Sequence, residues 1–187
     1  MKNTLKDIGG IVVDILLTVI IATLVGYAAL CGLAYSAFPA ETITADERVV
    51  ALTILGEARG EGNQGMYAVA CIIQERADKR KLTPAGVCLQ PWQFSVWNAG
   101  KGKVKKESEL HHLWKSKSTP YAKQLAHAIC RGWKLTQDFT GNANHYYSSD
   151  RKNPPYWTFK KEIVNGKEIK KAIKPTRRIG KHIFYKL

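Results

Sequence analysis

The sequence predicts an α+β protein in which a helical lobe is followed by a small β-rich C-terminal part and preceded by one transmembrane helix. Three observations predict this order: an apolar run near the N-terminus, apolar residues at helical spacing in the middle, and β-branched and aromatic residues from Phe139 onward. The chain has 187 residues, which suits one compact domain of about 140 to 150 residues with an appendage. We therefore expect an N-terminal anchor over residues 1–40 and one folded domain over residues 41–187.

The apolar run predicts one membrane-spanning helix over about residues 8–38. Its segment Ile15–Phe38 is 24 residues long without a charge, and about 20 residues cross a bilayer core. A cleaved signal peptide usually has a shorter apolar core, and a core helix is less expected because this run is apolar all round. We favour an uncleaved signal anchor over both alternatives.

The charges around the run predict its orientation and the surroundings of the domain. Two lysines precede the run and three acidic residues follow it closely, which favours a cytoplasmic N-terminus and a domain on the periplasmic or extracytoplasmic side of the cytoplasmic membrane. Charges within residues 1–40 cancel, so the net charge of +14 belongs to the domain. Such a charge suits nucleic acid, an anionic membrane or an anionic polymer. We expect no nucleic acid partner for an exported domain.

Local signals predict the elements in order. Thr44 and Glu47 form a capping-box pattern at the start of a helix that runs to about Arg59. Glycines break that helix, and a second one is expected over about Gln64–Ala77. Its expected buried face is Met66, Val69, Ala70 and Ile73.

Signals for helices and turns also occur in the second half of the chain. A short helix is expected around Glu109–Lys115. Thr119 as the N-cap residue, with Pro120 at the first helical position, predicts a third helix that ends near Gly132. Asn165-Gly166 between two strand-like runs predicts a hairpin.

Glu57 is the strongest candidate for chemistry. It extends the apolar stripe of Val50 and Ile54 at a helix end, beside glycines that leave room for a ligand. Burial favours the protonated form of a carboxyl group, which a general acid needs. The alternative is a solvated glutamate in the last helical turn. Glu61 is expected to be structural, pairing with Arg59 or Arg76.

Two aromatic stretches supply candidate binding residues. In Gln93–Asn98, aromatic rings suit sugar faces and amides suit hydroxyl and acetamido groups, although Trp97 and especially Phe94 also suit a core. The second stretch is Asn144–Tyr147, and His182 is a further match. The candidate binding residues are Gln93, Trp97, Asn98, His145, Tyr146, Tyr147 and His182.

Metal and disulfide chemistry are weakly indicated. A histidine pair would suit zinc, but no His-x-x-x-His spacing is present, so we expect no metal site and no cofactor. The chain has four cysteines, of which Cys31 lies in the predicted span. An exported domain with Cys71, Cys88 and Cys130 would have room for one disulfide.

Four short stretches together resemble a known family. Leu55–Glu61 (LGEARGE), Gln93–Asn98 (QFSVWN), Asn144–Tyr147 (NHYY) and Ile179–Tyr185 (IGKHIFY) resemble, in that order, the spore-cortex-lytic (SleB-like) cell-wall hydrolases. The resemblance implies a lysozyme- or lytic-transglycosylase-like helical lobe that cleaves peptidoglycan glycan strands with one glutamic acid, matched by Glu57. The sequence departs from the family at Val96, where a cysteine is common.

Other functions remain open at this point. A zinc-dependent N-acetylmuramoyl-L-alanine amidase and a non-catalytic, membrane-anchored wall-binding module are the alternatives. With the predicted anchor, the expected partners are bacterial peptidoglycan and the cytoplasmic membrane. The small size, positive charge and Gly/Ala-rich span suit a phage signal-arrest-release endolysin, and a host or virion-associated enzyme is the other possibility.

Overall fold

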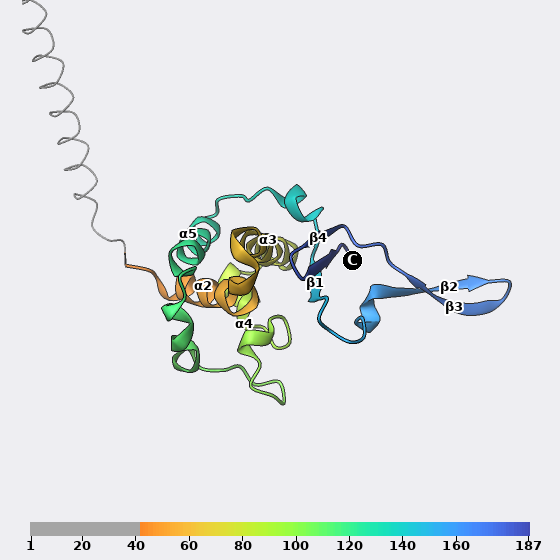
Figure 1. Ribbon diagram of the computed structural model, residues 1–187, viewed down its shortest axis with the longest axis horizontal. Helices are drawn as coiled ribbons and strands as arrows, with labels where there is room; N and C mark the ends of the chain where they lie inside the picture. The colour runs from red at the N-terminus through yellow and green to blue at the C-terminus, as the bar shows by residue number, and fades with distance from the viewer. Residues whose placement is uncertain (1–41) are drawn as a thin grey trace, which may run out of the picture. The chain divides into compact units, whose positions relative to one another are not determined.

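The computed structural model describes residues 42–187, of which residues 43–187 form one compact unit (Figure 1). The predicted span over about residues 8–38 lies outside the described residues, so it stays a prediction. Between residues 42 and 187, no helix is both long enough and apolar enough to cross a membrane.

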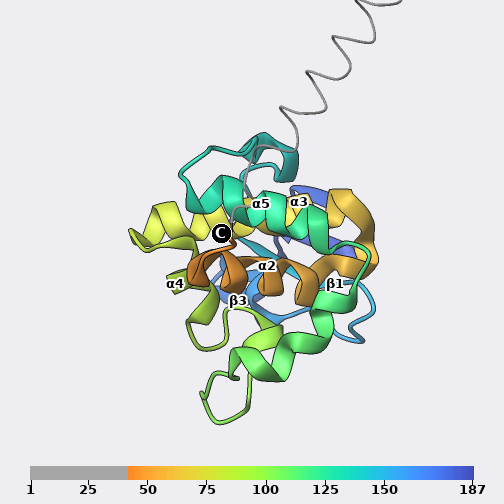
Figure 2. The same cartoon turned by 90° about the vertical axis from the view of Figure 1, so that its left-hand side faces the viewer.

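Helix α2 (Ala45–Ala58) is the centre of the helical lobe. The predicted capping box is confirmed: the Glu47 backbone N–H donates to Thr44 Oγ1 at 3.2 Å, and the Thr44 N–H donates to Glu47 Oε2 at 2.8 Å. Every residue from Val50 to Leu55 is buried, so the expected one-sided stripe is too narrow. Helices α3, α4 and α5 all pack on α2, and Figure 2 shows α5 alongside it. The burial of Val50 to Leu55 leaves α2 no solvent face along this stretch.

Helix α3 (Gly62–Arg80) follows the short 3₁₀ helix η1 (Arg59–Glu61) and is longer than predicted. Gly62 has a φ of 68°, which turns the chain between the two helices. The predicted face of α3 is buried in the helical core, while Ala68 and Ile72 pack in a second cluster beneath the sheet. Helix α3 therefore joins the two parts of the domain.

The remaining helices complete the lobe. Helix α5 starts with Thr119, preceded by Ser118 as the N-cap residue, so the predicted start is wrong by one position. The stretch predicted around Glu109–Lys115 is a 3₁₀ helix. The elements are α4 (Pro84–Leu89), η2 (Ser95–Trp97), η3 (Glu107–Lys115), α5 (Thr119–Cys130), η4 (Gln137–Thr140) and η5 (Tyr156–Thr158).

The β-rich C-terminal part is confirmed and consists of two antiparallel sheets. The first has the order β1-β5-β4, with β1 at His145–Ser148, β4 at Arg177–Ile179 and β5 at His182–Tyr185. The second is the predicted hairpin of β2 (Phe159–Val164) and β3 (Lys167–Ala172). Asn165 and Gly166, with φ values of 52° and 75°, form its turn. Phe184 of β5 packs on α3.

The cysteines of the described residues are reduced. Cys71 and Cys88 are buried, Cys130 is partly buried, and all three are free thiols. Burial raises the pKa of each thiol to about 12. The disulfide considered from the sequence is therefore not formed among these three residues, which behave as small apolar side chains.

Candidate active site

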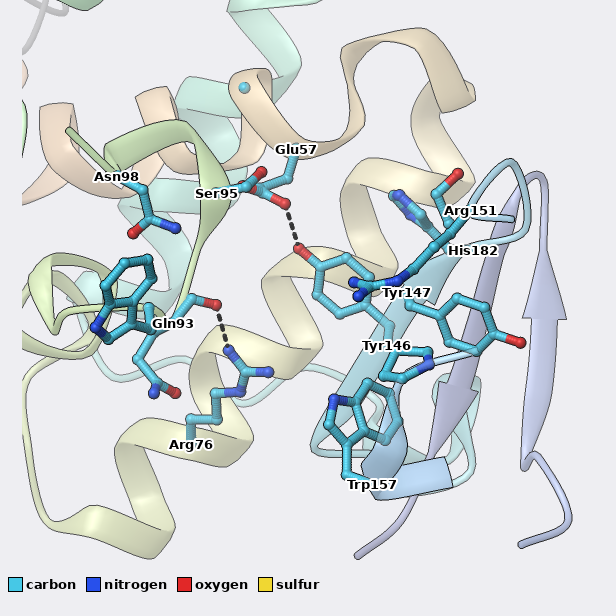
Figure 3. A pocket seen from close by; sticks show the side chains of 14 residues that line it. Glu57, Arg76, Gln93, Ser95, Asn98, Tyr146, Tyr147, Arg151, Trp157 and His182 are labelled. Carbon is cyan, nitrogen blue, oxygen red and sulfur yellow. Dashed lines mark hydrogen bonds between the residues drawn. The ribbon is translucent and has the colours of Figure 1, made fainter. Parts of the chain in front are cut away.

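A cavity of about 450 Å³ lies between the helical lobe and the first sheet (Figure 3). Its walls come from the end of α2, the segment from Trp92 to Asn98, strand β1, the segment around Trp157, and His182 of β5. Far-separated parts of the chain therefore meet around one space. This convergence is typical of a ligand site.

Glu57, in the last turn of α2, accepts three hydrogen bonds at the cavity wall. Its Oε1 accepts from Ser95 Oγ and from the Val96 backbone N–H, both at 2.9 Å. Its Oε2 accepts from the Tyr146 hydroxyl at 2.9 Å (Figure 3). Donors from η2 and β1 thus fix both carboxyl oxygens, and the carboxyl group cannot rotate without losing them.

Gly56 permits the close approach of η2 to α2. A Cβ atom at this position would lie 2.1 Å from Val96 Cγ2, which is far inside van der Waals contact. Glycine therefore lets the Val96 backbone reach Glu57. The departure from the family at residue 96 leaves this bond intact, because the backbone and not the side chain donates it.

Tyr146 holds Glu57 from the opposite side. Burial, followed by the nearby carboxylate of Glu57, raises the pKa of Tyr146 well above its usual range. The hydroxyl therefore keeps its proton and acts as a donor. Its ring packs 5.6 Å from Phe184 and 4.9 Å from His182, measured between ring centroids, so the donor is rigidly placed.

Arg76 of α3 ties the two walls together. Its Nε donates to the Asn144 carbonyl at 2.8 Å and its Nη1 to the Gln93 carbonyl at 3.0 Å, and the guanidinium lies 4.9 Å from the Phe94 ring centroid. The residue is buried and lines the cavity. One buried cation therefore fixes the spacing between the η2 segment and β1.

His182 of β5 is a buried residue of the cavity wall. It is 6% exposed, and its Nδ1 is buried without a hydrogen-bond partner among the described residues. Burial lowers the pKa of His182, while Glu61 and Glu57 act in the opposite direction. The lowered pKa favours the neutral form of the ring.

The structure brings most of the predicted site residues together. Lining the cavity are Glu57, Gln93, Asn98, Tyr146, Tyr147 and His182. The prediction for Trp97 is corrected: it is 2% exposed and its indole N–H donates to Thr53 Oγ1 at 2.8 Å inside the helical core. Phe94 is in the core as expected.

His145 also lies outside the cavity lining. Its Nδ1 is 2.9 Å from Asn144 Oδ1, and its ring packs against Trp157. Burial, with Arg76, Arg80 and Lys79 nearby, lowers the pKa of His145 to about 4. His145 therefore packs against Trp157 of the cavity wall, and its direct contact with a ligand stays a prediction.

Several lining residues were not predicted. They are Gly56, Arg76, Trp92, Ser95, Ser148, Arg151, Pro155 and Trp157. Ser95 lies within the Gln93–Asn98 stretch, so its hydroxyl was available as a signal. Trp92 is 65% exposed, and an exposed tryptophan beside a cavity indicates a ligand surface.

Glu61, the other glutamate of the first motif, does not line the cavity. Its Oε2 accepts from the Lys181 backbone N–H at 2.8 Å. Arg59 donates to the Leu55 carbonyl instead, at 3.2 Å, and Arg76 bonds two carbonyls as described above. The expected pairing with either arginine is wrong, because both arginines and Glu61 bond backbone groups instead.

The cavity therefore combines one carboxyl group with aromatic rings and amides. Glu57 is the only carboxylic acid among the residues that line it in the described part of the chain. Residues 42–187 contain no cluster of three or more side chains suited to hold a metal ion. Proton transfer by Glu57 is the chemistry that the arrangement offers.

Comparison with known proteins gives consistent matches. A spore cortex-lytic enzyme from Oceanobacillus iheyensis is 27% identical over 143 residues, which is 75% of this chain and 41% of that protein. The chain thus spans less than half of that relative. The catalytic domain of the Bacillus cereus SleB protein aligns with 27% identity, a TM-score of 0.47, and coverage of 75% of this chain and 89% of that chain.

The model of the family described as Cell Wall Hydrolase matches residues 60–185. The match starts three residues after Glu57, so the assignment of Glu57 depends on the geometry of the cavity. The match to the family model covers more than half of the chain and confirms the predicted resemblance. The chain belongs to the cell wall hydrolase family.

Proposed function

We propose that this domain cleaves the glycan strands of peptidoglycan, with Glu57 as the single general acid and base. The observation that carries the proposal is the fixed carboxyl group of Glu57, alone of its kind among the described lining residues and held by donors from η2 and β1. Glycosidases that use water commonly need a second carboxylate. Their second carboxylate has no counterpart among the described lining residues.

A lytic transglycosylase reaction fits a site with one carboxyl group. Glu57 donates its proton to the oxygen that links the muramic acid C1 to the next sugar, and the C1–O bond breaks. The C6 hydroxyl of the same muramic acid then forms a bond to C1, and the Glu57 carboxylate takes the hydroxyl proton. The products are a 1,6-anhydro end and a free hydroxyl, and Glu57 is again protonated.

The cavity rim supports a sugar substrate. Trp92, Tyr147 and Trp157 offer ring faces, while Gln93 and Asn98 offer amide groups. Sugar rings stack their C–H faces on aromatic side chains, and amides bond hydroxyl and acetamido groups. A cavity with this lining suits an N-acetylated glycan better than a stem peptide.

Product analysis tests the proposal directly. Purified peptidoglycan is digested with the protein, and the soluble fragments are analysed by mass spectrometry. We expect muramic ends that are lighter by one water than hydrolytic ends. Reducing ends would mean that water attacks and would remove the transglycosylase step. Free stem peptides with intact glycan would favour the amidase, and no fragments at all would favour the wall-binding module.

We also propose that residues 1–40 anchor the domain to the cytoplasmic membrane and that release of this anchor starts lysis. The support is the uncharged run of 24 residues from Ile15 to Phe38. Replacing residues 1–40 by a cleavable secretion signal should then cause earlier lysis than the intact chain. Equal or later lysis would contradict anchor release.

A further inference from the structure

The β2–β3 hairpin forms an arm that projects from the domain (Figure 1). Apart from one partly buried residue, every position of β2 and β3 is exposed, including Ile163 at 79%, Val164 at 45% and Ile169 at 43%. A two-stranded ribbon with no cover on either face has little stability of its own in water. Because the side chains of the arm are not used in the core, they are free to contact a partner.

The charge of the arm is strongly positive. Residues 159–172 contain five lysines and two glutamates, a net charge of +3. Lys160 lies directly opposite Lys171, and Lys161 lies directly opposite Lys170. Like charges in opposite positions destabilise a hairpin. Glu162 offsets the first pair through ion pairs with Lys160 and Lys171, at 2.7 and 3.0 Å, and Glu168 forms an ion pair with Lys161 at 2.8 Å. The arm keeps its net positive charge after these pairs are formed.

The base of the arm belongs to the wall of the cavity. Strand β2 follows η5 without a break, and Trp157 of η5 lines the cavity together with Pro155. The returning strand is fixed to the same segment, because the Ile173 N–H donates to the Thr158 carbonyl at 2.8 Å. A polymer that leaves the cavity past Trp157 therefore meets the arm, beginning at Tyr156, which is 89% exposed.

The distribution of apolar side chains argues against a membrane as the partner. Cross-strand neighbours share a face of a hairpin, so Ile163 shares its face with Glu168, while Ile169 is opposite Glu162 and Val164 is opposite Lys167 on the other face. Neither face is continuously apolar. A ribbon that lies in a bilayer needs one apolar face. A glycan that carries charged substituents instead suits faces that combine apolar and charged side chains.

We propose that the β2–β3 arm is a second binding surface for the same polymer, peptidoglycan, through carboxylate groups of its stem peptides beyond the cleavage point. This proposal rests on the proposed function of the cavity. A six-residue strand is about 20 Å long, so the lysines reach substituents that the cavity does not touch. The arm therefore increases retention on the insoluble polymer without taking part in bond cleavage.

The test uses the full domain with Glu57→Gln, so that binding is measured without cleavage. Lysines 160, 161, 170 and 171 are changed together to glutamine, and pelleting with peptidoglycan stripped of teichoic acids gives the affinity. We expect about a 10-fold loss, because each exposed ion pair contributes about 0.2 to 1 kcal/mol. A matched control changes lysines outside the arm and the cavity, at positions 81, 115, 117 and 123, and should lose less than about 3-fold.

Activity separates this proposal from the proposed function. With Glu57 present, the four arm substitutions should leave the cleavage of short soluble glycan fragments unchanged and should raise the KM for intact peptidoglycan. If both sets of four substitutions weaken binding equally, general charge is responsible and the arm is not a site. Binding that needs teichoic acid, or equal arm-dependent binding to vesicles of anionic lipid, would also overturn the proposal. If the wild type cleaves no glycan, the proposed function fails, yet the pelleting comparison still reports on the arm.

Discussion

Glu57 and Glu61 belong to the same short motif, yet the structure uses them differently. Glu57 lies in the last turn of α2 and faces the cavity with both oxygens held by donors. Glu61 lies in the turn after α2 and bonds the backbone of Lys181 in the β4–β5 turn. Each carboxylate accepts a backbone N–H from a distant segment, so the hydrogen bonds alone do not separate catalytic from structural roles.

Their surroundings do separate them. Glu61 packs closely against two glycines: a Cβ at Gly180 would lie 2.2 Å from Glu61 Oε2, and a Cβ at Gly65 would lie 2.2 Å from Glu61 Cβ. Glu57 has a glycine neighbour too, but Gly56 brings in η2 and leaves the cavity side open. Glu61 therefore links two turns at the surface, whereas Glu57 at the cavity is available to a substrate.

The largest expected effect comes from exchanging the acid for its amide at each position. Glu57→Gln keeps the shape but cannot donate a proton, so cleavage of purified walls should fall at least about 100-fold. Glu61→Gln should change the rate by no more than a few fold. Release of soluble fragments measures both. A reversal of the two effects would show that the wrong carboxylate has been named.

The second prediction concerns the donor opposite η2. Tyr146→Phe removes the hydrogen bond to Glu57 Oε2 and keeps the ring packing. Without this bond Oε2 is no longer held in place, and a misplaced catalytic group reacts more slowly, so we expect kcat to fall about 10-fold with little change in KM. The melting temperature serves as the control for folding. An unchanged kcat would mean that Ser95 and Val96 are sufficient to orient the acid.

Local sequence signals predicted elements of both the helical lobe and the β-rich part. The capping box of Thr44 and Glu47 acts within four residues, and Asn165-Gly166 sets its own turn, so both were visible without the fold. The one-sided stripe of α2 failed because three helices cover it, and burial from all sides is a property of tertiary packing.

The site itself was partly predictable. Motif resemblance identified Glu57 and Tyr146, but residue types cannot say that their side chains meet across 89 positions of sequence. Trp97 illustrates the converse error: an aromatic residue between Val96 and Asn98 suits a sugar, yet Thr53 offers its indole a partner inside the core. Arg76 was missed as a wall residue because its two acceptors are backbone carbonyls, which no motif shows.

The third prediction tests the structural role of Glu61. Glu61→Ala removes the acceptor of the Lys181 N–H and the link between η1 and the β4–β5 turn. Because this bond is at the surface, we expect a loss of about 1 kcal/mol in the free energy of unfolding, measured in urea. For Glu57→Ala, in contrast, the loss of unfolding free energy should be small in proportion to the loss of activity. A loss of activity without a loss of stability at Glu61 would break the distinction between the two residues.

The smallest expected effect is on the pKa of His182, on which the charges of both carboxylates act. Burial lowers the pKa of His182, and the charges of Glu61 and Glu57 raise it. A histidine whose folded pKa is lowered stabilises the fold while it is neutral, so this contribution is present above the unfolded pKa of about 6.5 and is lost as the pH falls below it. Glu61→Gln removes one raising charge and should lower the pKa of His182 further, so the loss of stability continues to lower pH than in the wild type.

Nuclear magnetic resonance titration of the His182 ring measures the pKa, and Lys181→Gln, which leaves the backbone bond to Glu61 intact, is the control. A pKa that stays the same or rises in Glu61→Gln would mean that the charge of Glu61 does not reach the cavity.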